Sequence, residues 1–245
     1  MEELADRLIA YRADNDWDRS EVDAYLTEHG LSYSYDRLEK TNWNQLWESN
    51  FEPVQVDDFV GMRASFHPPF LNVQHELIIT PKMSFGTGHH ATTRLMIQAM
   101  RDQVVPEARV LDFGTGTGVL AILAKKMGAG HVVGIDVEDW SVENAIENAQ
   151  ENKVNDIVFV CADRITNSGP FDLVLANINR NILLEHLSAL QTVLAPSGRL
   201  IMSGIIEEDL PVMDQALVQQ GFQRVRYAQE KGWVCIQLIH NQSNG

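Results

Sequence analysis

The stretch that decides the fold is VLDFGTGTGVLAILAKKMGA, residues 110–129. It opens with an apolar run that predicts a buried β-strand. Gly114, Gly116 and Gly118 follow, and apolar residues then recur at helical spacing from Val119 to Met127. A strand, a glycine-rich turn and a helix in this order are typical of an open parallel α/β sheet, in which ligands bind beyond the carboxyl ends of the strands. Glycines permit positive φ angles there and let a ligand approach the backbone closely.

The spacing of these glycines indicates which ligand the turn binds. A dinucleotide fingerprint reads Gly-x-Gly-x-x-Gly, but Val119 occupies the sixth place from Gly114, so the pattern is Gly-x-Gly-x-Gly. Asp112 precedes the turn, where a carboxylate repels a pyrophosphate and attracts an ammonium group. Asp136 ends the next predicted strand, where an acidic side chain accepts hydrogen bonds from ribose hydroxyls. A phosphate-free nucleoside with a cationic tail, S-adenosyl-L-methionine, fits all three features.

Two later strands also end in polar residues. Asp163 closes the run VFVCAD, where it would accept a hydrogen bond from an adenine amino group or, equally, cap a turn. Asn177 closes LVLAN, next to the expected position of the transferred methyl group. Its amide oxygen can accept a hydrogen bond from an incoming amine, or the side chain can hold the methionine end of the cofactor. A plain turn residue is the alternative interpretation of Asn177.

The rest of the chain alternates apolar runs with helical patterns, which predicts an α/β fold with a mostly parallel, doubly wound sheet of seven strands. The last two strands, 222–230 and 232–240, are too close for a crossover helix, so we expect an antiparallel hairpin at the sheet edge. The other expected strands are 109–113, 131–136, 156–163, 171–178 and 198–205, and the expected helices after the first are 141–152, 181–195 and 210–221.

Three parts of the chain are expected. Residues 1–48 predict a small α+β lobe with helices over 3–13 and 20–30, the second capped by Ser20. Residues 49–84 predict a linker and a β-hairpin made from 59–66 and 76–80. Residues 85–245 form the main domain.

Charge and composition indicate which kinds of partner and which cell compartment the protein suits. The net charge of −15 disfavours binding to nucleic acid. The first 50 residues hold 12 acidic and five basic residues, which suits either a solvated surface or docking of a cationic partner. No apolar run is long enough to span a membrane, and the N-terminus is too acidic for a signal peptide, so we expect a cytoplasmic protein. Cys161 and Cys235 lie outside any spacing typical of a metal site or disulfide framework.

Taken together, the glycine turn, Asp136 and Asn177 resemble the class I S-adenosylmethionine-dependent methyltransferases. FGTGHHATT, residues 85–93, resembles the signature loop of the PrmA family, the ribosomal protein L11 methyltransferases, and LANINRNIL, residues 175–183, is similar to the fourth-strand motif of that family. The likeness runs from about Trp43 to the C-terminus. It implies a Rossmann-like methyltransferase sheet and a longer N-terminal substrate-recognition lobe than residues 1–48 provide, so this lobe is expected to be a shortened one.

The resemblance also implies an activity and a site. The expected enzyme is a protein-lysine N-methyltransferase that modifies lysine ε-amines and the N-terminal α-amine of ribosomal protein L11, with Asn177 orienting the amine and no metal. FGTGHHATT would be a second wall over the methionine part of the cofactor, in which His89 and His90 are either structural or a catalytic base. Expected cofactor contacts are Phe85, Gly86, Thr87, Gly88, Thr93, Asp112, Gly114, Gly116, Gly118, Asp136, Asp163 and Asn177.

Two other functions remain open from the sequence. A methyltransferase of the same fold acting on another protein or on a small-molecule amine would carry the same cofactor motifs. A module that binds the cofactor without catalysis would also keep the glycine turn. Methyl-transfer activity separates these readings.

Overall fold

The structure is a computed structural model that describes residues 2–4, 7–9, 19–31, 34, 52–80, 88–165 and 169–241. The chain divides into two units, Met1–Asn42 and Trp43–Gly245. The second unit contains the predicted glycine turn. The three-part division at residues 48 and 84 remains a prediction.

The first unit differs from the predicted pair of helices. Strands β1 (Glu2–Leu4) and β2 (Arg7–Ile9) pair antiparallel, with Glu2 opposite Ile9, so the helix predicted over 3–13 was wrong. Apolar residues at a spacing of four fit a helix and also fit a tight pair of strands, and here strand pairing takes precedence. The second predicted helix is confirmed as α1 (Arg19–Glu28), which begins one residue before Ser20.

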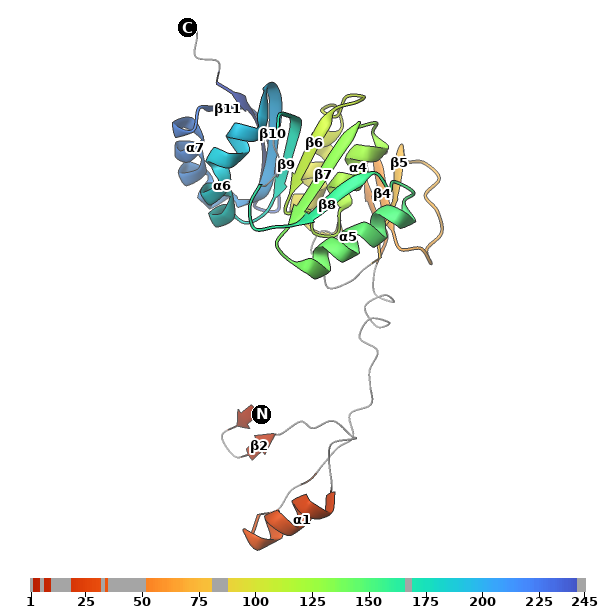
Figure 1. The fold of residues 1–245 in the computed structure, drawn as a ribbon, viewed down its shortest axis with the longest axis vertical. Helices are drawn as coiled ribbons and strands as arrows, with labels where there is room; N and C mark the ends of the chain where they lie inside the picture. Colours follow the sequence, from red (N-terminus) through yellow and green to blue (C-terminus); the bar gives the residue numbers. More distant parts are fainter. Residues whose placement is uncertain are drawn as a thin grey trace. The chain divides into compact units, whose positions relative to one another are not determined.

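The second unit is built on a seven-stranded sheet with the order β11-β12-β10-β9-β6-β7-β8 (Figure 1). Strands β6 to β10 run parallel, whereas β12 pairs antiparallel with both β10 and β11. This confirms the predicted sheet and its C-terminal edge hairpin. The strands are β6 (Arg109–Phe113), β7 (His131–Asp136), β8 (Ile157–Cys161), β9 (Phe171–Asn177), β10 (Leu194–Ile206), β11 (Phe222–Glu230) and β12 (Trp233–His240).

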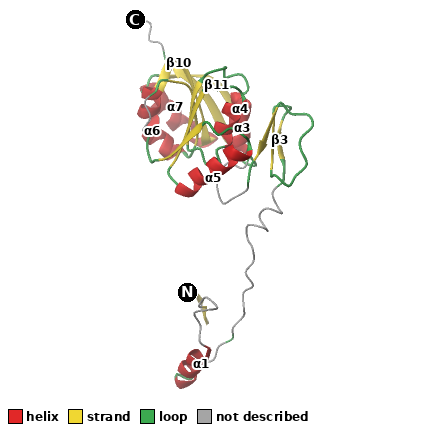
Figure 2. Ribbon diagram, turned by 45° about the vertical axis from the view of Figure 1, so that its right-hand side comes forward, coloured by secondary structure: helices red, strands yellow, loops and turns green. Residues whose placement is uncertain are grey.

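Helices cover both faces of this sheet (Figure 2). Successive residues of a strand point to opposite faces, so Val110 of β6 joins the core beneath α3 and α4 while Leu111 joins the core beneath α6 and α7. Burial on both faces explains the continuous apolar runs in the strand sequences. The helices are α3 (Ala91–Met100), α4 (Val119–Lys126), α5 (Asp139–Glu151), α6 (Arg180–Val193) and α7 (Leu210–Gln219), with a short 3₁₀ helix η2 (Glu207–Asp209) before α7.

A separate three-stranded sheet precedes α3, with strands β3 (Val54–Val56), β4 (Val60–Arg63) and β5 (His75–Ile78). Strands β3 and β4 form an antiparallel hairpin, but β4 and β5 run parallel, so the hairpin predicted between 59–66 and 76–80 was wrong.

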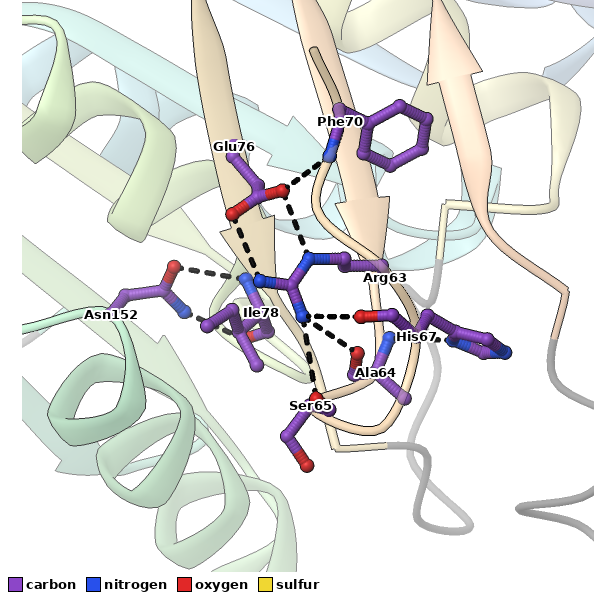
Figure 3. Close-up of polar contacts among 8 residues, drawn as sticks. All are labelled: Arg63, Ala64, Ser65, His67, Phe70, Glu76, Ile78 and Asn152. Atoms are coloured by element: carbon purple, nitrogen blue, oxygen red, sulfur yellow. Dashed lines mark hydrogen bonds and ion pairs between the residues drawn. The ribbon is translucent and has the colours of Figure 1, made fainter.

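A buried arginine holds the segment that connects the parallel strands β4 and β5. The Arg63 guanidinium donates to the carbonyls of Ala64 and His67, each at 3.1 Å, and makes a bidentate ion pair with Glu76 at 2.9 and 3.0 Å (Figure 3). Glu76 in turn accepts from the backbone N–H of Phe70 at 2.8 Å. These contacts hold the chain that leads back to the start of β5.

In the part of the chain that the structure describes, no helix is long and apolar enough to cross a membrane.

Candidate active site

The glycine turn lies between β6 and α4, at the carboxyl end of the central strands. Gly114, Gly116 and Gly118 have φ angles of 79°, 54° and 79°, which is the left-handed backbone that the sequence predicts for them. A Cβ atom on Gly114 would lie 2.1 Å from Cγ2 of Ile178, the residue after β9. The turn therefore needs glycine at Gly114 both for its backbone conformation and for the close approach of Ile178.

Asp112 is a buried carboxyl group beneath this turn. Its Oδ2 accepts from the Thr115 hydroxyl at 2.7 Å and from the backbone N–H of Ala121 at 3.2 Å. Its Oδ1 is buried and accepts no hydrogen bond from any residue that the structure describes. Burial raises the pKa of Asp112 to about 7. The two hydrogen bonds lower the pKa, and repulsion from Asp136 raises it further. A cationic ligand at Oδ1 would offset the free-energy cost of ionising this buried carboxyl group.

Asp136 ends β7 and supports the same turn. One carboxylate oxygen accepts from the backbone N–H of Gly116 at 2.8 Å, and the other accepts from the backbone N–H of Glu138 at 3.1 Å. Each carboxylate oxygen can accept more than one hydrogen bond, so Asp136 can hold the turn and still bind vicinal hydroxyls. The position suits the predicted ribose contact.

Asn177 ends β9, the other neighbour of β6. Ala176 pairs with Phe113 across the two strands, so Asn177 lies beside Gly114. Its Nδ2 lies 3.5 Å from the hydroxyl of Thr93, which is fully buried on α3. Its Oδ1 is buried without a hydrogen-bond partner among the described residues. Thr93 and the glycine turn thus both lie next to Asn177, while the second wall over the cofactor stays a prediction.

The two adjacent histidines before α3 have structural contacts. His90 is the N-cap of α3, where its Nδ1 accepts from the backbone N–H of Thr92 at 3.3 Å, and its ring contacts Trp233 edge-on at 4.7 Å. Burial and then the charge of Arg94 lower the pKa of His90. The Nε2 of His89 lies 2.9 Å from the carbonyl oxygen of Glu52. These contacts favour the structural alternative for both residues.

Sequence reasoning missed Arg94, the residue after Thr93. Its guanidinium pairs with Glu230 on β11, with Nε 3.0 Å from Oε1, and also donates to the carbonyl of His89. It thereby ties the start of α3 to the C-terminal hairpin. The signal was available, because Arg94 is the sole charged residue of the otherwise uncharged helix ATTRLMIQAM.

The structure does not bring every predicted cofactor-contact residue to the glycine turn. Asp163 lies two residues beyond β8, its side chain is 79% exposed, and its ion pair with Arg164 measures 3.8 Å. Its adenine contact therefore remains a prediction. Gly88 has a φ of 89°, and a Cβ there would lie 2.5 Å from Cε of Met62. Phe85, Gly86 and Thr87 fall outside the described residues.

A family model described as ribosomal protein L11 methyltransferase (PrmA) matches residues 6–241. The chain belongs to this family. It is 40% identical to the ribosomal protein L11 methyltransferase of Porphyromonas gingivalis over 227 residues, which cover 89% of this chain and 78% of that protein. It is 34% identical to the ribosomal protein L11 methyltransferase of Chlorobaculum tepidum over 251 residues, which cover 93% of this chain and 83% of that protein.

Solved structures agree with this membership of the PrmA family. A ribosomal protein L11 methylase from Lactobacillus delbrueckii subsp. bulgaricus superposes with a TM-score of 0.71 at 31% identity and covers 78% of this chain and 100% of that one. A magnesium protoporphyrin IX methyltransferase from Synechocystis, solved with bound S-adenosylmethionine, has a TM-score of 0.53 at 21% identity and covers 65% of this chain and 86% of that one. The second likeness is one of fold alone. Together they confirm the predicted family and methyltransferase fold, while the roles of individual residues remain predictions.

Proposed function

We propose that this chain transfers methyl groups from S-adenosyl-L-methionine to lysine ε-amines and to the N-terminal α-amine of ribosomal protein L11. One observation carries the proposal: Asp112, near the end of β6, and Asn177, at the end of the neighbouring β9, each have a buried side-chain oxygen without a hydrogen-bond partner among the described residues. One oxygen belongs to a carboxyl group and the other to a neutral amide. That pair suits a ligand with an ammonium tail and an amine that must react beside it. Membership of the PrmA family supports the choice of protein substrate.

The residues around the glycine turn fit this cofactor. Asp112 Oδ1 would take the ammonium group, since a buried carboxylate with no counter-charge gains most from a cation. Asp136 would accept from the ribose hydroxyls. Gly114, Gly116 and Gly118 carry no side chain, so a ligand could approach the backbone of the turn closely. Bound here, S-adenosylmethionine supplies the methyl group on a cationic sulfur, and no phosphate has to be accommodated near Asp112.

Asn177 and its surroundings would prepare the amine. A free lysine with a pKa of ~10.4 must lose its proton before it can attack, which costs roughly 4.6 kcal/mol at pH 7. A site shielded from water beside a positive charge lowers that pKa. The Asn177 Oδ1 can then accept a hydrogen bond from the neutral amine and direct its lone pair, while the contact to Thr93 fixes the amide rotamer.

A comparison of methyl acceptors in separate reactions tests the proposal. The chain is incubated with tritiated S-adenosylmethionine and, separately, ribosomal protein L11, another basic ribosomal protein of similar size, and free lysine. We expect label in ribosomal protein L11 alone, with strong loss in Asn177→Ala. Equal labelling of all three acceptors, or none in a preparation that binds the cofactor, would contradict the proposal.

A further inference from the structure

Asn148 on α5 and Asn152, the C-cap residue of α5, are buried and face the outer edge of β5. Asn152 accepts from the backbone N–H of Ile78 at 3.0 Å and donates to the carbonyl of Ile78 at 2.6 Å (Figure 3). Asn148, one helical turn earlier, accepts from the backbone N–H of Thr80 at 2.9 Å. Their exposed fractions are 6% and 0%. These amides complete the hydrogen bonds of the edge in place of another strand.

The spacing of the two elements makes this pairing possible. Four residues of an α-helix advance about 6 Å along its axis. Two residues of an extended chain advance about 6.6 Å. Side chains four apart on α5 therefore meet alternate backbone groups of the chain that leaves β5. Asn148 and Asn152 share this edge role, the first from within α5 and the second from its C-cap.

Asn148 has one contact that Asn152 lacks. Its Nδ2 donates to the carbonyl oxygen of Thr117 at 2.9 Å. Thr117 lies within the glycine turn, and the N–H of the same peptide group, that of Gly118, donates to the carbonyl of Thr115 at 2.8 Å. Both ends of this peptide group are therefore fixed.

Fixing that peptide group has a consequence for the turn. Glycine adopts positive and negative φ with similar ease, so a peptide plane next to Gly118 can rotate at low cost unless its carbonyl is held. Rotation would move the backbone that faces the ligand. On the other side of the turn, Asp136 holds the N–H of Gly116. Asn148 on α5 likewise holds the Thr117 carbonyl of the turn.

We propose that Asn148 is a positioning residue for the cofactor: it holds the Thr117 carbonyl and so keeps the glycine turn in its ligand-binding shape. The inference rests on the proposed function in so far as it takes S-adenosylmethionine as the ligand of the turn. Asn148 also connects the turn to Thr80, at the exit of the three-stranded sheet. Asn152 supports the same exit without reaching the turn.

Matched substitutions separate the two roles. Asn148→Asp keeps an acceptor for Thr80 and replaces the donor to Thr117 by an oxygen, and Asn152→Asp makes the same change one turn away. Both variants should lose thermal stability. Asn148→Asp should weaken the binding of S-adenosylhomocysteine by about three- to tenfold, the worth of one net hydrogen bond, whereas Asn152→Asp should leave the Kd within about twofold. Calorimetry on folded protein, verified by circular dichroism, measures both values.

Hydrogen exchange gives a second readout that needs no ligand. Without cofactor, amides of the peptide containing residues 114–118 should exchange faster in Asn148→Asp than in Asn152→Asp. Equal changes of Kd in the two variants, or equal exchange in that peptide, would overturn the inference. If the unsubstituted chain fails to bind S-adenosylhomocysteine, the proposed function fails instead, and hydrogen exchange alone then decides the role of Asn148. Should Asn148→Asp not fold, Asn148→Ser and Asn152→Ser replace the pair.

Discussion

Replacing Asp112 by asparagine should stabilise the ligand-free protein and weaken cofactor binding. The folded protein holds the pKa of Asp112 at about 7, chiefly through burial, against a reference of 3.8. Between these values the folded chain keeps a proton that the unfolded chain loses, so the contribution of Asp112 to stability falls as pH rises through that window. The loss is complete above pH 7. A pKa difference of this size lowers the free energy of unfolding by as much as ~4 kcal/mol.

In the Asp112→Asn variant, the amide oxygen would accept the same bonds from Thr115 and Ala121, but the side chain has no charge to bury. Chemical denaturation of the ligand-free proteins should therefore give similar free energies of unfolding near pH 4. The advantage of Asp112→Asn should grow toward pH 8.

With S-adenosylhomocysteine bound, the unsubstituted protein should be more stable than the Asp112→Asn variant. A charge-assisted hydrogen bond to an ammonium group is worth about 1.5–3 kcal/mol, so Asp112→Asn should raise the Kd for S-adenosylhomocysteine by roughly ten- to hundredfold. Binding near pH 6 should release a proton from Asp112, which calorimetry detects by comparing buffers with different heats of ionisation. The variant should release none from this position.

Two results would refute this reasoning. One is a variant no more stable than the unsubstituted protein at pH 8, which would mean that the carboxylate already has a partner. The other is an unchanged Kd for S-adenosylhomocysteine. Either result would remove Asp112 from the cofactor site.

Three further substitutions and a deletion test the other predicted roles. Asp136→Ala should weaken S-adenosylhomocysteine binding by about 1.5–3 kcal/mol in calorimetry, and unchanged binding would refute the ribose contact. Asn177→Ala should lower kcat more than it raises the cofactor KM, whereas an effect on KM alone would place Asn177 with the cofactor only. Asn144→Leu should raise the melting temperature, because the Asn144 amide is buried without a partner among the described residues, and a lower one would reveal a partner. Deleting residues 1–42 should abolish methylation of the protein substrate and spare cofactor binding. Added salt should likewise slow methylation by the intact chain, and insensitivity to both would exclude docking by this acidic unit.

The sequence predicted the parts of the fold that depend on local pattern. Apolar runs separated by helical stretches locate the strands of the main sheet closely, and Gly114, Gly116 and Gly118 mark their turn because glycine adopts positive φ at less cost than residues with a Cβ. The short spacing around Lys231 correctly predicts the C-terminal hairpin. Each of these features follows from residues close together in the chain.

Features that depend on distant partners were missed. The parallel course of β4 and β5 is accompanied by an ion pair between the buried Arg63 and the half-buried Glu76, and spacing alone cannot show that these two residues meet. Asn148 looks like an ordinary polar residue of an amphipathic helix until Thr80 and Thr117 are placed on either side of it. The short strands β1 and β2 were mistaken for a helix because an apolar spacing of four satisfies both patterns.

The most direct test of the account is to locate the transferred methyl group. Purified ribosomal protein L11 is incubated with the chain and with S-adenosylmethionine carrying a deuterated methyl group, then digested and analysed by mass spectrometry. The account predicts labelled methyl groups on lysine side chains and on the N-terminal amine, and strongly reduced label with Asn177→Ala. Unlabelled ribosomal protein L11, from a preparation that binds S-adenosylhomocysteine in calorimetry, would contradict it.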